Sequence, residues 1–213
     1  MRAAGARIAG WVVIGFALAW AGIGGAGCAA AGRPGQGGGR DYAQARRLAE
    51  RALSAEDAGN PQGAIELYRQ AIGVAPDFAA AHNNLGSLLM EAGDSRGADA
   101  AFDRAATHTP NDPRPVYNRG LIRERQHWYE EARAFYEQAL ERDRNDLDSL
   151  WGLVRVNHLR DTRDEEALGI VRRALLLEPD PVRRDYLLQQ KIIIENRLAQ
   201  PKPLALARAA ARR

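Results

Sequence analysis

The chain has 213 residues, of which 46% are hydrophobic and 7% aromatic, and its formal net charge is +3. Its two ends, residues 1–40 and 200–213, hold eight basic residues and no acidic one, which leaves 22 basic against 27 acidic residues between them. The central part therefore has no basic excess with which to neutralise phosphates, which argues against a nucleic-acid-binding domain. An alanine-rich, aromatic-poor composition favours closely packed helices over strands.

The first segment has the composition of an export signal. Arg2 and Arg7 precede an uncharged stretch of 24 residues, 8–31, whose first half is strongly apolar. This order of a basic and an apolar region predicts a targeting element over residues 1–28 that takes no part in the fold. Cys28 is the only cysteine, so the chain cannot contain a disulfide framework.

The residues around Cys28 resemble the cleavage site of bacterial lipoproteins. Ala26 and Gly27 stand directly before the cysteine and fit that pattern, whereas Gly25 replaces the Leu, Val or Ile that the family prefers. The resemblance implies cleavage before Cys28 and lipidation of its thiol. It also implies sorting to the outer membrane, because Ala29 rather than Asp follows the cysteine.

Two alternatives to a lipid anchor remain open. The uncharged stretch is longer than the roughly 20 residues that cross a bilayer, so it could stay in the membrane as an uncleaved helix. It could also be a simple cleaved signal with Cys28 incidental. Either anchor places the rest of the chain outside the cytoplasm, in the bacterial periplasm, on a flexible Gly-rich linker at residues 29–41.

From residue 45 onward the sequence repeats itself. One small residue recurs at Ala64, Ala98, Ala132 and Ala167, in steps of 34, 34 and 35 residues. An interval of this length is typical of stacked helical hairpins. Such a stack is extended along one axis and presents a long surface to a partner.

Apolar residues at helical spacing, separated by Gly, Pro, Asn and Asp, predict two helices in each interval. We expect no strands, and a fold class of all-α with an α-solenoid of about four hairpins. A helical stripe after the fourth interval predicts a capping helix, and the residues beyond it, 200–213, read as a basic mobile tail. The predicted hairpins span residues 45–78, 79–112, 113–146 and 147–180 within a repeat region 42–180, and the capping helix spans 181–199.

Small and large residues alternate in the way that closely crossing helices require. Gly86 and Gly120 stand where only a small side chain fits, and Tyr68, Phe102 and Tyr136 stand where a ring must fill the gap to the next hairpin. This spacing resembles the tetratricopeptide repeat family over about residues 45–180. The fourth unit departs from it, as terminal repeats often do.

The resemblance implies a concave groove lined by the first helix of each hairpin, at its second, fifth, ninth and twelfth positions. Two aromatic residues, Tyr117 and Trp151, fall at equivalent positions of neighbouring units, and such rings and arginines dominate binding surfaces. Each of them could instead pack between hairpins. The predicted groove residues are Asn83, Asn84, Ser87, Arg114, Tyr117, Asn118, Leu121, Trp151, Arg155 and His158.

Some members of the family hold the C-terminal carboxylate of a peptide with Lys and Asn side chains. Asn84 and Arg114 match that pattern, but Ala49 and Leu53 stand where the first unit should carry the Lys and Asn, and Asn118 stands where a base should. This sequence therefore argues against that mode of binding.

No residues of the sequence form a plausible catalytic group. The four histidines fall in different hairpins without metal-ligand spacing, and no phosphate-binding loop follows a strand. We therefore expect no enzyme activity, no metal and no cofactor.

These patterns predict a membrane-tethered scaffold that binds a segment of a partner protein during assembly of the cell envelope. Two other hypotheses remain. The chain could be a structural subunit that associates with copies of itself through the convex face, or it could be an accessory module of a cell-wall enzyme.

Overall fold

The computed structural model describes residues 41–200, and the export signal, Cys28, most of the linker and nearly all of the basic tail lie outside this range. Within it the chain forms nine α-helices and no strand, as predicted. No helix in the described range is long and apolar enough to span a bilayer. The helices are α1 Tyr42–Asp57, α2 Pro61–Val74, α3 Ala79–Glu91, α4 Ser95–His108, α5 Arg114–Arg125, α6 Tyr129–Arg142, α7 Leu147–Leu159, α8 Glu165–Leu177 and α9 Pro181–Ala199.

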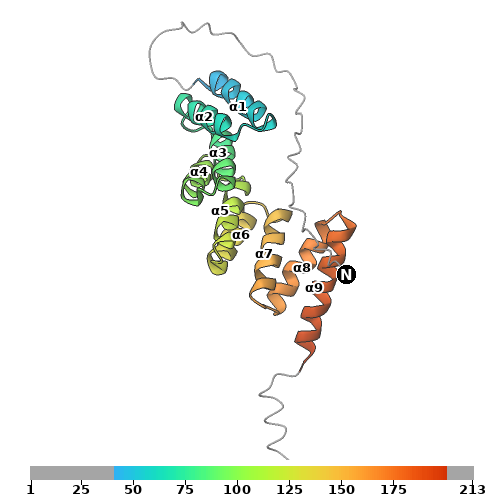
Figure 1. Cartoon of the computed structure of the whole chain (residues 1–213). Helices are drawn as coiled ribbons and strands as arrows, with labels where there is room; N and C mark the ends of the chain where they lie inside the picture. The colour runs from blue at the N-terminus through green and yellow to red at the C-terminus, as the bar shows by residue number, and fades with distance from the viewer. Residues whose placement is uncertain (1–40, 201–213) are drawn as a thin grey trace, which may run out of the picture. The chain divides into compact units, whose positions relative to one another are not determined.

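The helices pack as four successive hairpins (Figure 1). α1 contacts α2, α3 contacts α4, α5 contacts α6 and α7 contacts α8, and each second helix also contacts the first helix of the next hairpin. First helices touch one another where α3 meets α5 and α5 meets α7. This arrangement confirms the α-solenoid, with α9 packed on α8 at its end.

Most helices begin at a side chain that caps them. In six of the nine described helices an Asp or Asn accepts a hydrogen bond from a backbone N–H three residues later, which satisfies one of the unpaired groups of the first turn. These caps explain why helices begin where short polar residues follow a turn. The capping residues are Asp41, Asn60, Asp94, Asp146, Asp164 and Asp180.

The turn inside each hairpin needs one residue with left-handed backbone geometry, and that residue also recurs every 34 positions. Gly59 and Gly93 fill it in the first two hairpins, with φ angles of 72° and 85°. His127 and Asp161 fill it in the last two, with φ angles of 62° and 55°. Glycine adopts this geometry without steric cost, whereas His and Asp do so at some expense of stability.

The hairpins close around rings that face glycines. A Cβ atom added to Gly86 would lie 2.7 Å from the Phe102 ring, and one added to Gly120 would lie 2.5 Å from the Tyr136 ring. Gly152 of the next hairpin approaches the other side of Tyr136, where an added Cβ would lie 2.7 Å from it. Both rings are completely buried, which confirms that small residues let the helices cross closely around the aromatic ones.

Candidate protein-binding groove

The middle of the predicted groove is a small network of amide and hydroxyl groups. The amide nitrogen of Asn118 on α5 donates to the side-chain oxygen of Asn83 on α3, at 3.3 Å. Ser87 donates to the backbone carbonyl of Asn83, also at 3.3 Å. All three side chains are partly exposed, so the structure brings these predicted residues together across two hairpins and leaves amide groups accessible.

Asn84 has a structural role that the sequence did not predict. Its amide donates to the hydroxyl of Tyr68 in the preceding hairpin, at 3.0 Å. That hydroxyl in turn donates to the Glu56 carboxylate at 2.7 Å. Asn84 therefore ties two hairpins together, and its amide is engaged within the chain instead of facing a partner.

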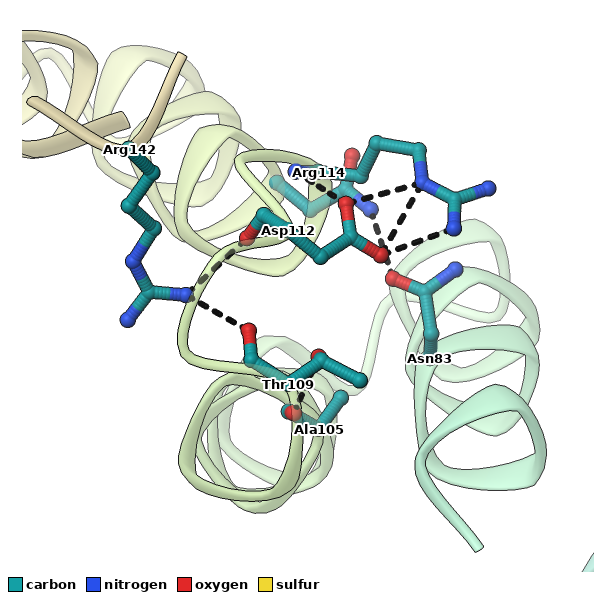
Figure 2. A network of polar contacts seen from close by, with 7 residues as sticks. Asn83, Ala105, Thr109, Asp112, Arg114 and Arg142 are labelled. Carbon is teal, nitrogen blue, oxygen red and sulfur yellow. Dashed lines mark hydrogen bonds and ion pairs between the residues drawn. The ribbon is translucent and has the colours of Figure 1, made fainter. Parts of the chain in front are cut away.

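Arg114 lies at the edge of the groove and is fixed by its neighbour Asp112. Figure 2 shows the guanidinium group turned onto the carboxylate, with a closest contact of 2.7 Å. The Arg114 side chain remains 74% exposed. Burial by itself would raise the pKa of Asp112, but the hydrogen bonds from Arg114 outweigh it and lower that pKa. Arg142 holds the same loop by donating to the carbonyl oxygens of Thr109 and Asp112.

Tyr117 and Leu121 of α5 are partly buried, in line with groove positions that also contact the core. The Tyr117 ring lies 5.5 Å from the buried Tyr136 ring, centre to centre. Burial raises the pKa of the Tyr117 hydroxyl, so it stays protonated at neutral pH. Tyr117 is therefore held against the core, and only part of its side chain remains available to the groove.

The prediction that Trp151 lines an open groove is wrong, because the residue is only 8% exposed. α9 covers it: Tyr186 stacks at 5.7 Å between ring centres, and the Arg183 guanidinium lies 4.7 Å from the ring centre. The indole N–H donates to the buried Glu178 carboxylate at 2.6 Å, which Arg183 also contacts at 3.1 Å. Trp151 thus packs against the capping helix α9 and is not available to a partner protein.

Arg155 likewise turns inward, toward Glu124 of the preceding hairpin. Two hydrogen bonds of 2.9 and 3.0 Å join its guanidinium to that carboxylate, which also accepts from the Tyr136 hydroxyl. Burial alone would lower the pKa of Arg155, but the hydrogen bonds with Glu124 outweigh it and raise that pKa. Since its guanidinium is already engaged, Arg155 offers a partner little beyond the 35% of its side chain that remains exposed.

His158 remains exposed at the far end of α7, but it too contacts the capping helix. Its Nδ1 lies 3.3 Å from the Gln190 side-chain oxygen, and its ring meets Tyr186 edge-on at 6.4 Å. Together with Trp151, this shows that α9 occupies the part of the groove that belongs to the fourth hairpin.

The open part of the groove therefore lies over the first three hairpins. Leu53 of α1 is 48% exposed. Leu121, at the equivalent position of α5, and Met90, three residues beyond the equivalent Ser87 of α3, are partly exposed. Leu53 is absent from the predicted groove residues, although the same register extended back to the first hairpin includes it. Beside it, burial raises the pKa of Glu56, and repulsion from Glu91 adds to this.

In residues 41–200 no three metal-ligating side chains come together in a way that could hold an ion. The groups that the groove presents together are the amides of Asn83 and Asn118, the hydroxyl of Ser87 and the apolar side chains beside them. These can bind a peptide backbone and apolar side chains, but they supply no nucleophile with an adjacent base.

Comparison with protein families identifies the repeat. Models described as tetratricopeptide repeat match residues 50–113 and 113–146. The described chain is thus an α-solenoid, and residues 50–146 of it carry tetratricopeptide repeats. No curated protein matches the chain in sequence.

Solved structures share the fold. A structure of pilF from Pseudomonas aeruginosa is 21% identical with a TM-score of 0.64 over 74% of this chain and 72% of that one. MamA is 20% identical with a TM-score of 0.58 over 67% of this chain and 83% of that one. The first tetratricopeptide domain of Spaghetti (RPAP3), bound to the HSP90 peptide SRMEEVD, is 20% identical with a TM-score of 0.53 over 57% and 97%.

Proposed function

We propose that the chain is a membrane-tethered scaffold of the cell envelope that binds a segment of a partner protein in the groove over its first three hairpins. The repeat is one whose known structures include a peptide complex, that of Spaghetti with an HSP90 peptide. Tetratricopeptide repeats typically serve protein interaction rather than catalysis, and this supports a binding role here.

One observation carries the proposal. The groove offers partly exposed apolar side chains on three successive first helices, beside the accessible amides of Asn83 and Asn118. Leu53, at 48% exposure, is the most open of these apolar groups. A segment that places apolar side chains on this stripe and its backbone against the amides would bury surface that now faces water.

Photo-cross-linking in living cells tests the groove. A photoreactive phenylalanine analogue at Leu53 should give one defined adduct, whereas the same analogue at the exposed Gln138 of α6, outside the groove, should not. With the analogue at Ser87 instead, Leu53→Glu should abolish the adduct formed from that position. Binding of the segment would bury the new carboxylate without a partner, which is costly. Leu176→Glu, at a side chain that is 84% exposed on α8, is the matched control and should leave it intact. Equal adduct yields from Leu53 and Gln138 would refute the proposal that the partner binds in the groove.

Membrane attachment has a separate test. The pattern around Cys28 supports lipidation, so Cys28→Ser should end the incorporation of labelled fatty acid and release the chain from membranes. If the variant stays in membranes without taking up the label, the anchor is an uncleaved helix and not a lipid. If wild type and variant are both released from membranes, the proposed membrane anchor is wrong, and the proposed binding of a partner in the groove is unaffected.

A further inference from the structure

The turn between α5 and α6 departs in two ways from the equivalent turns of the first two hairpins. The first two hairpins have Gly59–Asn60 and Gly93–Asp94, in which the glycine takes the left-handed conformation and the next residue caps the following helix. Here His127 takes the left-handed conformation, and Trp128 stands at the cap position without a capping hydrogen bond. Both changes cost stability, and the contacts that they gain within the chain are a hydrogen bond between His127 and Tyr129 and the Arg123 guanidinium near the Trp128 ring.

As a result of these two changes, the turn carries an exposed indole ring that is held in one place. Trp128 is 52% exposed. The Arg123 guanidinium lies 5.6 Å from the centre of its ring and is itself anchored to Asp99 at 2.9 Å. His127 and the Tyr129 hydroxyl form a hydrogen bond of 2.8 Å that fixes the turn. A large ring that is both exposed and held in place is suited to fill a pocket, because little freedom is lost on binding.

A pocket of suitable character lies elsewhere on the same chain, in a cleft between α6 and α8 with a volume of about 990 Å³. Its floor is apolar, and its rim carries carboxylates and guanidinium groups. Two lining residues are also engaged with neighbouring groups: Glu166 pairs with Arg133, and Arg173 donates to the backbone carbonyl of Arg144. The apolar floor consists of Leu140, Leu153 and Ile170, and the charged rim includes Glu137, Glu141, Arg144 and Arg173.

The wall of this cleft contains a glycine that internal packing does not explain. Gly169 lies in the middle of α8, where glycine weakens a helix relative to alanine. A Cβ atom added there would meet nothing within 4 Å. The two equivalent positions before it are Ala100 and Ala134. A glycine at this point leaves room for something outside the hairpin to approach the helix backbone.

We propose that the α6–α8 cleft of one copy of this chain receives the Trp128 turn of a second copy. The charges on the two surfaces are complementary. The turn is basic on its α5 side, at Arg125, and acidic on its α6 side, at Glu131, while the cleft offers Glu141 to the first and Arg144 and Arg173 to the second. A ring held rigid by Arg123 favours a shaped protein pocket over lipid, which makes no use of one fixed orientation.

The contact joins different surfaces of the two copies, so it is heterologous. Each copy retains a free turn at one side and a free cleft at the other, and association therefore continues head to tail unless it closes into a ring. This assembly leaves the groove over the first three hairpins unused, so it is independent of the proposed partner site.

Sedimentation velocity of the full chain in a non-ionic detergent tests this. The wild type should shift to larger species as its concentration rises. Trp128→Asp removes the ring but supplies the cap that Asp94 provides in the second hairpin, and Gly169→Gln fills the cleft while improving the helix. Neither change should unfold the chain, and each alone should weaken association by at least about tenfold.

Mixing the two variants gives the decisive result. Trp128→Asp keeps an intact cleft and Gly169→Gln keeps an intact turn, so an equimolar mixture should form heterodimers that grow no further. A wild type that stays monomeric at every concentration overturns the proposal, as does association that survives both variants. If the monomeric wild type, but not Trp128→Asp, co-sediments with phosphatidylcholine vesicles, the turn belongs to a membrane contact instead.

Discussion

The first and third hairpins have the same design at their centres but different neighbours. Tyr68 and Tyr136 are both completely buried, and each donates its hydroxyl to a glutamate twelve residues earlier, Glu56 or Glu124. In the N-terminal half the next hairpin adds only the neutral amide of Asn84 to this pair. In the C-terminal half it adds the charged Arg155.

This difference decides where the groove is open. Glu124 and Arg155 neutralise one another, and α9 encloses Trp151, so these charged and aromatic groups of the third and fourth units are used within the chain. Asn118 of the third unit remains partly exposed. In the first unit Leu53 and its neighbours have no comparable cover. Repeats with one fold can therefore differ in binding because their neighbours differ.

The largest effect should come from removing the ring that two hairpins share. Tyr136→Ala leaves a cavity between Gly120 and Gly152, and a buried aromatic residue truncated to alanine costs about 3–5 kcal/mol. Guanidinium unfolding followed by helical circular dichroism measures the loss. The exposed Gln138→Ala in the same helix is the control and should change little. A loss below about 1 kcal/mol for Tyr136→Ala would contradict shared packing.

The comparison between the two glutamates predicts a smaller and unequal effect. Glu124→Gln leaves the Arg155 guanidinium without a carboxylate and should cost about 1–3 kcal/mol, less than a fully buried pair because the Arg155 side chain is 35% exposed. Glu56→Gln removes the charge but keeps a side-chain oxygen that can accept from Tyr68, and it should cost at most about 1 kcal/mol. Equal losses would mean that the ion pair contributes nothing beyond the tyrosine hydrogen bond.

The turns allow a matched test of backbone geometry. His127→Gly should stabilise the chain by about 1 kcal/mol, since it relieves a left-handed residue that is not glycine. Gly93→Ala in the second hairpin should destabilise it by a similar amount for the same reason. Thermal unfolding of both variants checks the opposite signs. Shifts in the same direction would show that the φ angle is not what separates the two turns.

The smallest effect should depend on pH and belongs to the second hairpin. Burial lowers the pKa of His82 from its ordinary value of 6.5, and the nearby His108 and Arg104 act in the same direction, while the bond to the Pro76 carbonyl opposes them. The unfolded chain therefore takes up a proton before the folded chain does. Stability is complete above pH 6.5 and declines as the pH falls toward the lower pKa of the folded state.

Urea midpoints measured from neutral to mildly acidic pH test this. His82→Gln should flatten that part of the profile, whereas Gln138→Ala, at an exposed residue that does not titrate, should retain the wild-type slope. An unchanged slope in His82→Gln would assign the acid sensitivity to other groups.

Much of the fold could be predicted because its signals are local. The 34-residue period, the turn residues and the paired glycines and rings each depend on neighbours within one hairpin or the next, and the helices begin and end close to where those patterns place them. The feature that no local rule predicts is the pair of departures at His127 and Trp128, since the turn forms there in spite of them.

The candidate site could be predicted only in part. Asn83, Ser87 and Asn118 do lie together, because their spacing puts them on one face of successive first helices. Trp151, Asn84 and Arg155 have the same spacing but are engaged within the chain. What separates the two groups is the identity of residues far away in sequence, such as Glu178 for Trp151, which lies 27 residues later.

The amino-acid sequence by itself determined the helical hairpins, their number and their order, because each depends on periodicity and turn chemistry over a few dozen residues. Only the tertiary structure decided which groove positions stay open, because that depends on which side chains α9 and the neighbouring hairpins bring against them. Those contacts join residues that share no local pattern, and a buried ring or ion pair looks the same in sequence as an exposed one.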